Sequence, residues 1–82
     1  MFKIGEVIHY YDKLGVAIIE LDGTVSVGDI IKFVRGGEDL FEQSIESIQV
    51  EHQKLESAGK GQTVGIKTIQ TVKEGAEIFK KG

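Results

Sequence analysis

Histidine, serine and carboxylate side chains are the groups in this sequence that could do chemistry, and their spacing limits what they can do. The chain has two histidines, His9 and His52, which lie 43 positions apart, and it has no cysteine. A protein metal site needs several converging ligands, so we predict no metal site. No serine stands in the Gly-x-Ser-x-Gly turn that exposes a nucleophile. We therefore predict no catalytic residues and no enzyme activity.

A glycine-rich segment at residues 59–63, Gly-Lys-Gly-Gln-Thr, is the part that comes nearest to a phosphate-binding loop. Such a loop needs Gly-x-x-x-x-Gly-Lys-Ser/Thr between a strand and a helix, so that backbone amides and the helix terminus hold the phosphate. The spacing here is different, and no helix is predicted after the segment. We interpret it as a turn that enters a strand, and we predict no cofactor and no binding of GTP.

Binding, in contrast to catalysis, has candidate residues. Tyr10, Tyr11 and Lys13 lie together at the first predicted turn, where the aromatic rings could stack on a base and the lysine could contact a phosphate. Lys60 begins a basic segment, residues 60–82, with five lysines against two glutamates. The alternative is structural, because two tyrosines at a strand end commonly cover the end of a barrel with their hydroxyls in water. These four residues are the candidate sites for RNA or another partner.

Size and charge limit the class of protein further. With 82 residues, a net charge of −3 and 40% hydrophobic residues, the chain is predicted to form one domain, residues 1–82. The acidic balance argues against binding nucleic acid through bulk charge alone. The longest aliphatic run, residues 16–19, is far shorter than the roughly 20 apolar residues of a membrane helix, and the amino terminus has no signal-peptide pattern. We expect a cytoplasmic protein with no membrane contact.

A recurring glycine pattern places the structural elements that must position these residues. An apolar residue, a glycine three positions on and an apolar residue three further occur around Gly28, Gly61 and Gly75. Glycine adopts positive φ without a Cβ penalty, so each pattern predicts a tight turn into a strand. Gly23 belongs to a further turn, and Gly65 lies inside a strand where it would allow close approach of another backbone. We expect six strands, at residues 3–10, 16–21, 30–34, 40–50, 62–68 and 77–80.

Alternation within these strands predicts which side chains face the core. Ala17, Ile19 and Leu21 share one face of their strand and are expected to point inward. In the segment 40–50 the apolar alternation changes phase at residues 46–47, which predicts a β-bulge that bends the strand. Residues 52–60 are expected to form a loop, with a short helical turn as the alternative because Leu55 and Ala58 are three positions apart. Six strands in so short a chain favour a closed barrel, which removes exposed strand edges.

Four sequence segments carry a resemblance to known proteins. They are Ile-Gly-Glu-Val at 4–7, Gly-x-Val-x-Val-Gly-Asp-x-Ile at 23–31, Ala-Gly-Lys-Gly-Gln-Thr-Val-Gly-Ile at 58–66 and Val-Lys-Glu-Gly at 72–75. Together they resemble domain II, the β-barrel, of translational GTPases such as elongation factor Tu. They are more similar still to small stand-alone translation elongation factor-like proteins, and also to the C-terminal barrel of a collagenase-like peptidase family. The resemblance implies an all-β fold, a single closed six-stranded Greek-key β-barrel.

This resemblance implies two functions of different classes. The first is a non-catalytic binding module that contacts tRNA, rRNA or the ribosome; it would not bind GTP, because the guanine-nucleotide motifs lie in a domain that the chain lacks. Gln62 and Ala76 depart from the acidic residues that such barrels often carry there. The alternative is a protein-interaction or accessory domain associated with a collagenase-like peptidase. Its motivation includes the acidic segment 38–56, which holds six acidic residues against one lysine.

Overall fold

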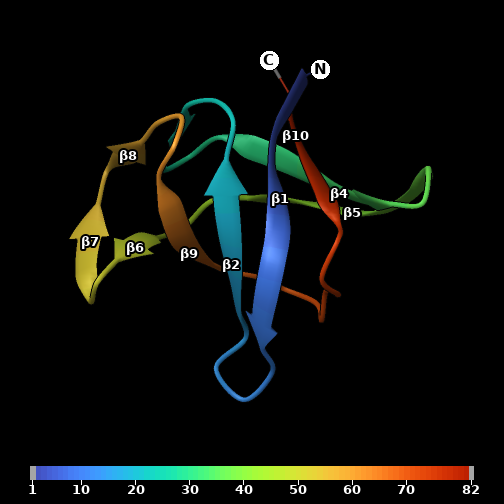
Figure 1. Ribbon diagram of the computed structural model, residues 1–82, viewed down its shortest axis with the longest axis horizontal. Helices are drawn as coiled ribbons and strands as arrows, with labels where there is room; N and C mark the ends of the chain where they lie inside the picture. The colour runs from blue at the N-terminus through green and yellow to red at the C-terminus, as the bar shows by residue number, and fades with distance from the viewer. Residues whose placement is uncertain (1, 82) are drawn as a thin grey trace.

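The computed structural model describes residues 2–81, and all regular elements in that range are β-strands (Figure 1). The all-β prediction is therefore confirmed. The strands are β1 (Phe2–Tyr11), β2 (Val16–Leu21), β3 (Val25–Ser26), β4 (Ile30–Arg35), β5 (Glu38–Ser44), β6 (Ile48–Val50), β7 (Gln53–Leu55), β8 (Ser57–Ala58), β9 (Thr63–Lys67) and β10 (Glu77–Lys81). The predicted loop at 52–60 contains the short strands β7 and β8. The other expected strands correspond to β1, β2, β4, β9, β10 and the divided pair β5 and β6.

The main sheet is strongly curved but open. Its eight strands follow the order β5-β4-β10-β1-β2-β9-β6-β7, and β3 pairs with β8 in a separate two-stranded sheet. In Figure 1, β1, β2, β9, β6 and β7 follow one another toward the left, while β4 and β5 run across the others. No backbone ladder joins the edge strands β5 and β7 among the described residues. The predicted closed six-stranded barrel is therefore wrong in both closure and strand number.

A side chain, and not a strand ladder, connects the edge strand β5 to the segment that follows β9. Gln43 is 8% exposed, and its Nε2 donates a hydrogen bond of 2.8 Å to the carbonyl oxygen of Lys67. Its Oε1 accepts a bond of 2.8 Å from the backbone N–H of Ile69. Buried backbone groups need partners. Gln43 supplies them where regular strand pairing has ended, which is the physical reason that the sheet can remain open here.

The phase change in segment 40–50 is resolved by a break in the strand. β5 ends at Ser44 and β6 starts at Ile48, so the predicted bulge at Glu46 and Ser47 is replaced by an irregular stretch. Ile45 exchanges backbone hydrogen bonds with the β3–β4 turn, where it donates to Asp29 and accepts from Gly28. Ile45 and Ile48 are both buried. The break thus achieves what a bulge would have achieved, because it returns both isoleucines to the same interior.

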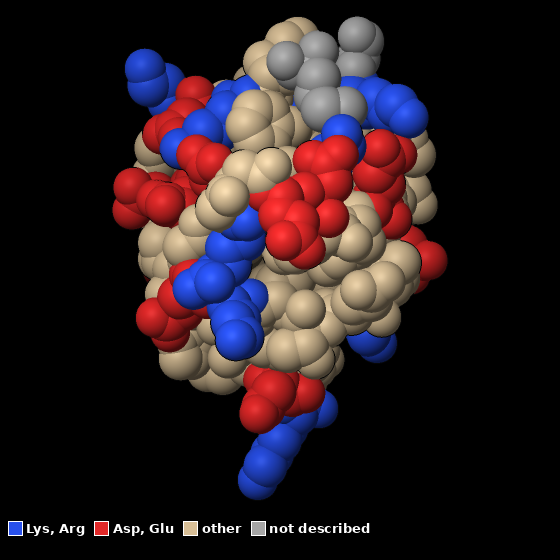
Figure 2. All heavy atoms as spheres, turned by 90° about the vertical axis from the view of Figure 1, so that its right-hand side faces the viewer, with Lys and Arg blue, Asp and Glu red and all other residues tan. Residues whose placement is uncertain are grey.

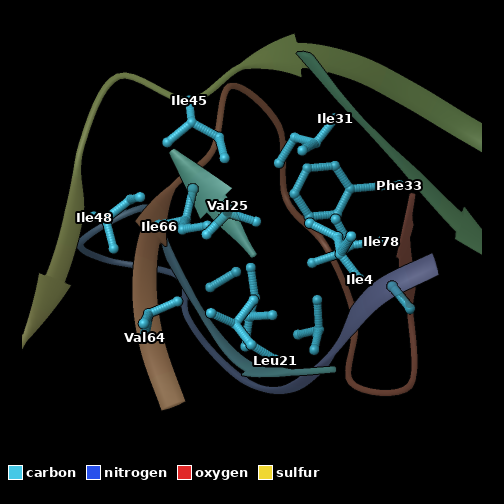
Figure 3. Packing of buried hydrophobic residues seen from close by; sticks show 14 of the residues in the cluster. Ile4, Leu21, Val25, Ile31, Phe33, Ile45, Ile48, Val64, Ile66 and Ile78 are labelled. Carbon is cyan, nitrogen blue, oxygen red and sulfur yellow. The ribbon is translucent and has the colours of Figure 1, made fainter. Parts of the chain in front are cut away.

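The core lies inside the curve of the sheet (Figure 3). Ala17, Ile19 and Leu21 of β2 all point into it, as their alternation predicted. The ring of Phe33 stacks on that of Phe41 at a centroid distance of 4.6 Å. The buried hydrophobic cluster consists of Ile4, Val7, Ala17, Ile19, Leu21, Val25, Ile31, Phe33, Ile45, Ile48, Ala58, Val64, Ile66, Val72, Ala76 and Ile78. Burial of this apolar surface is the main source of stability in a domain without disulfides.

The recurring glycines lie immediately before strands. Gly28, Gly61 and Gly75 have φ angles of 97°, 90° and 90°, and each lies two residues before β4, β9 or β10. The apolar positions on either side of these glycines are buried, namely Val25, Ile31, Ala58, Val64, Val72 and Ile78. Gly23 has another role, since a Cβ there would lie 3.3 Å from the Cγ2 of Ile4. The pattern therefore couples a turn to two core anchors.

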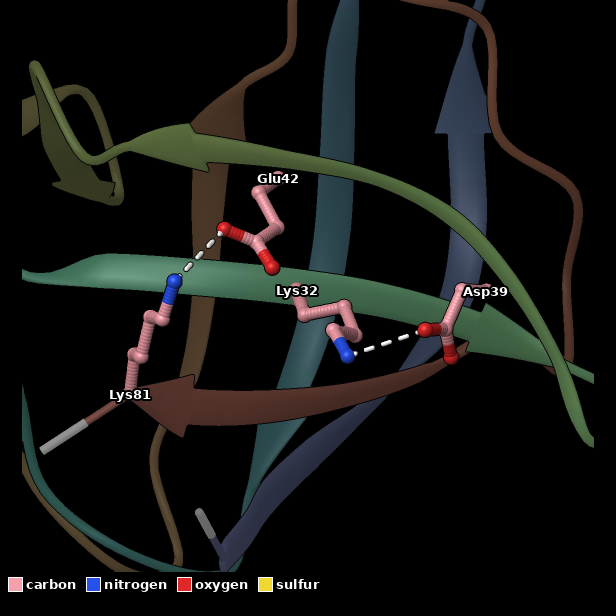
Figure 4. Close-up of polar contacts among 4 residues, drawn as sticks. All are labelled: Lys32, Asp39, Glu42 and Lys81. Atoms are coloured by element: carbon pink, nitrogen blue, oxygen red, sulfur yellow. Dashed lines mark hydrogen bonds and ion pairs between the residues drawn. The ribbon is translucent and has the colours of Figure 1, made fainter.

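Ion pairs join strands on the outer surface, one between the neighbouring strands β4 and β5 and one from β10 past β4 to β5 (Figure 4). Lys32 of β4 donates a 2.9 Å hydrogen bond to Asp39 of β5, and Lys81 of β10 lies 3.2 Å from Glu42 of β5. The hydrogen bond to Asp39 raises the pKa of Lys32 above its usual value of 10.5. Acidic and basic side chains are mixed on the face seen in Figure 2. The acidic segment 38–56 is thus partly neutralised by lysines from other strands.

Candidate functional site

The two tyrosines predicted to bind a partner point to opposite sides of the sheet. Tyr10 is partly buried and packs against the hydrophobic core, whereas Tyr11 is 47% exposed on the outer face. Successive side chains of a strand face opposite sides, so the two rings cannot form one stacking platform. Lys13 is exposed in the turn between β1 and β2. Tyr11 lines a concave surface of the domain.

Lys60 lies far from this group. Its neighbour Gly61 donates a backbone hydrogen bond to Leu21 at the end of β2, whereas Tyr11 pairs with Val16 at the start of β2. Five residues along a strand span about 17 Å. The structure therefore brings Tyr11 and Lys13 to one end of the sheet and places Lys60 toward the other.

A groove on the outer face of β2, β9 and β6 is the most developed hollow that involves a predicted residue. We call it the outer groove; its volume is about 320 Å³, and its lining residues are Tyr11, Leu14, Val16, Ile18, Gln49, Val50, Glu51, His52, Thr63, Val64 and Gly65. A second hollow of about 220 Å³ shares Leu14, Val16, Gln49 and Gly65 with it and extends to Ser47 and Lys67. The two form one continuous depression across the sheet.

Gly65 forms the floor of the outer groove. It lies between Ile18 of β2 and Gln49 of β6 in the sheet register. A Cβ at this position would lie 3.2 Å from Val16 Cγ1 and 3.5 Å from Ile18 Cδ1. The missing side chain therefore allows the outward side chains of β2 to lean over β9, and it leaves a hollow behind them. The close approach predicted for Gly65 comes from side chains of β2 together with the carbonyl oxygen of Gln49, 3.8 Å away.

The rim of the outer groove contains a strained turn. Glu51 and His52 connect β6 to β7 and have φ angles of 49° and 68°. Two positive φ angles define the hairpin turn that Asn-Gly favours. For residues with a Cβ, the left-handed conformation costs about 1 kcal/mol or more each. This turn places the side chains of Glu51 and His52 at the edge of the groove.

The mouth of the outer groove exposes large apolar side chains. Leu14 is 66% exposed in the β1–β2 turn, and Ile69 is 67% exposed after β9. The two segments are joined by a 2.9 Å hydrogen bond from the N–H of Thr68 to the carbonyl oxygen of Gly15. Tyr11 and Leu14 line the outer groove at this end, and the segment that carries Ile69 is attached to the β1–β2 turn by that bond.

The titratable groups of residues 2–81 include no cluster that could hold a metal ion. No group of three histidine or acidic side chains converges there. His9 Nδ1 lies 3.3 Å from Glu74 Oε2, and its ring meets the ring of Tyr11 edge-on at 4.5 Å. These contacts attach the outer face of β1 to the segment before β10. The described range also lacks any helix of the length and apolarity needed to cross a bilayer.

The chain is similar in sequence to known peptidases. No protein-family model matches the chain. It is 35% identical over 77 residues to an uncharacterized protease of Methanocaldococcus jannaschii, a match that covers 94% of this chain and 19% of the protease. It is 31% identical over 78 residues to a collagenase of Porphyromonas gingivalis, covering 94% of this chain and 22% of the collagenase. The chain spans about a fifth of the length of these curated relatives.

The chain is also similar in structure to a domain of a peptidase. The C-terminal domain of a putative U32 peptidase from Geobacillus thermoleovorans superposes with a TM-score of 0.90 at 24% identity, over 99% of this chain and 93% of that domain. Its selenomethionine variant gives a TM-score of 0.85 at 25% identity, over 95% and 96% of the two chains. The chain has the fold of this peptidase C-terminal domain.

These findings correct the translation-factor interpretation. The similar proteins named above are a protease, a collagenase and a peptidase domain, so the expected elongation factor-like, ribosome-associated and tRNA- or rRNA-binding module is wrong. The physical reason lies in the motifs that suggested it. The glycine turns and their buried apolar neighbours specify a small β-fold, and a fold does not by itself specify a function. The peptidase-associated alternative is the one that the relatives support.

Sequence reasoning missed most of the outer groove. Leu14, Val16 and Ile18 carried a usable signal, because they are large apolar residues in a turn or on the face of β2 that points away from the core. Glu51 and His52 carried none, since their conformation depends on the pairing of β6 with β7.

Proposed function

We propose that this chain is an accessory domain of a collagenase-like peptidase, a non-catalytic protein-interaction module. One observation carries the proposal: 94% of the chain matches about a fifth of a protease and of a collagenase. The fold likeness to a peptidase C-terminal domain supports it. In this proposal the catalytic groups belong to the remaining four fifths of such an enzyme.

The geometry suits a domain that binds polypeptide. The outer groove is built on strands of one sheet, so its walls are held in place by backbone ladders. A partner that binds there loses little energy to rearrangement of the domain. Physical linkage of such a surface to a catalytic domain raises the local concentration of the bound polypeptide. The accessory domain would therefore lower the KM for large substrates and leave the chemical step unchanged.

The proposal is tested by a chimera of the Porphyromonas gingivalis collagenase in which this chain replaces the matching segment. We expect deletion of the segment to raise KM for fluorescent gelatin by at least about tenfold, with kcat retained, because the lost interaction is one of uniform binding. The chimera should recover the lower KM. An unrelated β-domain of similar length is the control insert.

Two results would overturn the proposed function. One is an unchanged KM after deletion, together with no difference between the chimera and the control insert. The other is gelatin hydrolysis by this chain alone at a rate that accounts for the chimera. Short dipeptide substrates provide an internal check, because their hydrolysis should not respond to the accessory domain.

A further inference from the structure

We propose that the outer groove binds an extended segment of a polypeptide substrate, with a bulky apolar side chain against Val16 and Ile18 and a basic side chain beside Glu51. The inference rests on the proposed function and deepens it, because it assigns the interaction to one surface and defines the chemistry of its partner. It has three independent supports, from the shape, the charge and the position of the groove.

The shape and composition of the outer groove suit apolar side chains. Its walls are formed by Val16, Ile18 and Val50, and Leu14 and Tyr11 stand at its mouth. A volume of about 320 Å³ lies at the lower end of the range for small-molecule pockets. It therefore fits one or two side chains of a peptide better than a large cofactor. Gly65 contributes no side chain of its own, and the side chains of Val16 and Ile18 lean over it, so these two residues form the apolar surface that a bound side chain would contact.

The charge at the rim favours a basic neighbour for that apolar side chain. Glu51 is the one carboxylate among the residues that line the outer groove, and no lysine or arginine is among them; Lys67 lines the adjoining hollow, which does not include Glu51. Within the described part of the chain, no cation forms an ion pair with Glu51. A lysine or arginine of the bound segment would supply that missing partner. An acidic residue in the same place would be repelled.

The position of the groove favours a segment from a separate molecule. Phe2 pairs with Lys80, so residues 2 and 81 lie at the same end of the domain. Tyr11, at the mouth, is the last residue of β1, and Leu14 lies in the β1–β2 turn, which is in the lower part of Figure 1. Nine residue steps along β1 span about 30 Å. A longer protein that continues from either end would therefore leave the domain on the side away from the mouth, which remains open to a substrate.

The experiment is an NMR titration of the ¹⁵N-labelled chain with designed probes. The first probe is a capped octapeptide of glycine and serine that contains one phenylalanine and, two positions before it, one lysine. In the second probe the lysine lies two positions after the phenylalanine. Each probe has a matched counterpart with glutamate in place of lysine. We expect localised shifts at Gln49, Glu51 and Gly65. The better lysine probe should bind about tenfold more tightly than its glutamate counterpart.

Variants of exposed residues separate the groove from the rest of the surface. Leu14→Ser should weaken the lysine probe about tenfold, because it removes an apolar wall at the mouth. Glu51→Lys should abolish or reverse the preference for lysine over glutamate. The matched controls are Phe2→Ser, which removes an exposed apolar side chain at the other end of β1, and Glu38→Lys, which makes the same charge change at the tip of the β4–β5 hairpin. Both controls should bind like the unsubstituted chain.

The inference is overturned if the shifts lie outside the outer groove or if the lysine and glutamate probes bind equally to the unsubstituted chain and to Glu51→Lys. It is also overturned if only an added peptidase catalytic domain, and no peptide, shifts the groove residues. The chimera distinguishes this failure from failure of the proposed function. If the chimera still lowers KM when it carries Leu14→Ser and Glu51→Lys, the accessory role stands and the groove is not the binding site. If the chimera has no effect on KM while the chain alone binds the peptide as expected, the groove binds peptide and the accessory role is wrong.

Discussion

At the scale of single residues, Gln43 connects the edge strand β5 to the segment that follows β9. It is buried, and it satisfies the carbonyl of Lys67 and the N–H of Ile69. We predict that Gln43→Leu lowers the free energy of unfolding by about 2 kcal/mol, because both backbone groups lose their partner while desolvated. Urea unfolding followed by circular dichroism measures this. Gln53→Leu, at an exposed position of β7, is the control and should change stability by less than about 0.5 kcal/mol; equal effects of the two substitutions would contradict this role.

For a second residue, His52, we expect a substitution to stabilise the domain. His52 has a φ of 68° in the β6–β7 turn, where glycine pays no Cβ penalty. We predict that His52→Gly raises the free energy of unfolding by about 1 kcal/mol, since the relief of strain exceeds the entropy that glycine adds to the unfolded chain. Lys54→Gly, two residues later in β7, should lower it instead, because that position is regular strand. Thermal unfolding of both variants decides the matter, and a destabilised His52→Gly would mean that the turn is held by contacts of the imidazole.

At the scale of elements, the strands with a full run of alternation could be predicted from the sequence. The bounds of β2 match the expected range, and the inward face of Ala17, Ile19 and Leu21 follows from period two. β3, β7 and β8 have two or three residues each, too few to show a period, and they exist because a partner strand lies beside them. The break after Ser44 was signalled by its phase change, but whether a bulge or a gap would resolve it depends on contacts with the distant β3–β4 turn.

The candidate site shows the same division between local and distant information. Tyr11 and Gly65 could be singled out from the sequence because an exposed aromatic residue and a glycine within a strand are local signals. The groove between them depends on the register that places Gly65 beside Ile18 and Gln49. That register depends on how the strands pair around the whole core. The alternation within one strand does not specify which residues of another strand lie beside it, so the outer groove could not be derived from the sequence.

At the scale of the whole molecule, β10 determines whether the domain exists as one unit. It is the last strand in the chain, yet it lies between β4 and β1 and is the one strand that joins the β4–β5 hairpin to the rest of the main sheet. It also contributes Ile78, which is fully buried. Pairing between elements so distant in sequence carries a large loop-closure cost that only the completed sheet repays. The fold is therefore expected to form cooperatively, with no stable intermediate that lacks β10.

Deletion of residues 77–82 tests this expectation. We predict that the shortened chain loses amide dispersion in its NMR spectrum and shows no cooperative unfolding transition, because two ladders and a core side chain are removed together. The matched control is Glu77→Ala, which removes the ion pair to Lys3 but keeps the backbone ladders. An exposed ion pair contributes little, so the control should remain folded, within about 1 kcal/mol of the unsubstituted chain. A dispersed spectrum for the deleted chain would mean that the sheet order allows two independently stable halves, and the cooperative role of β10 would then be wrong.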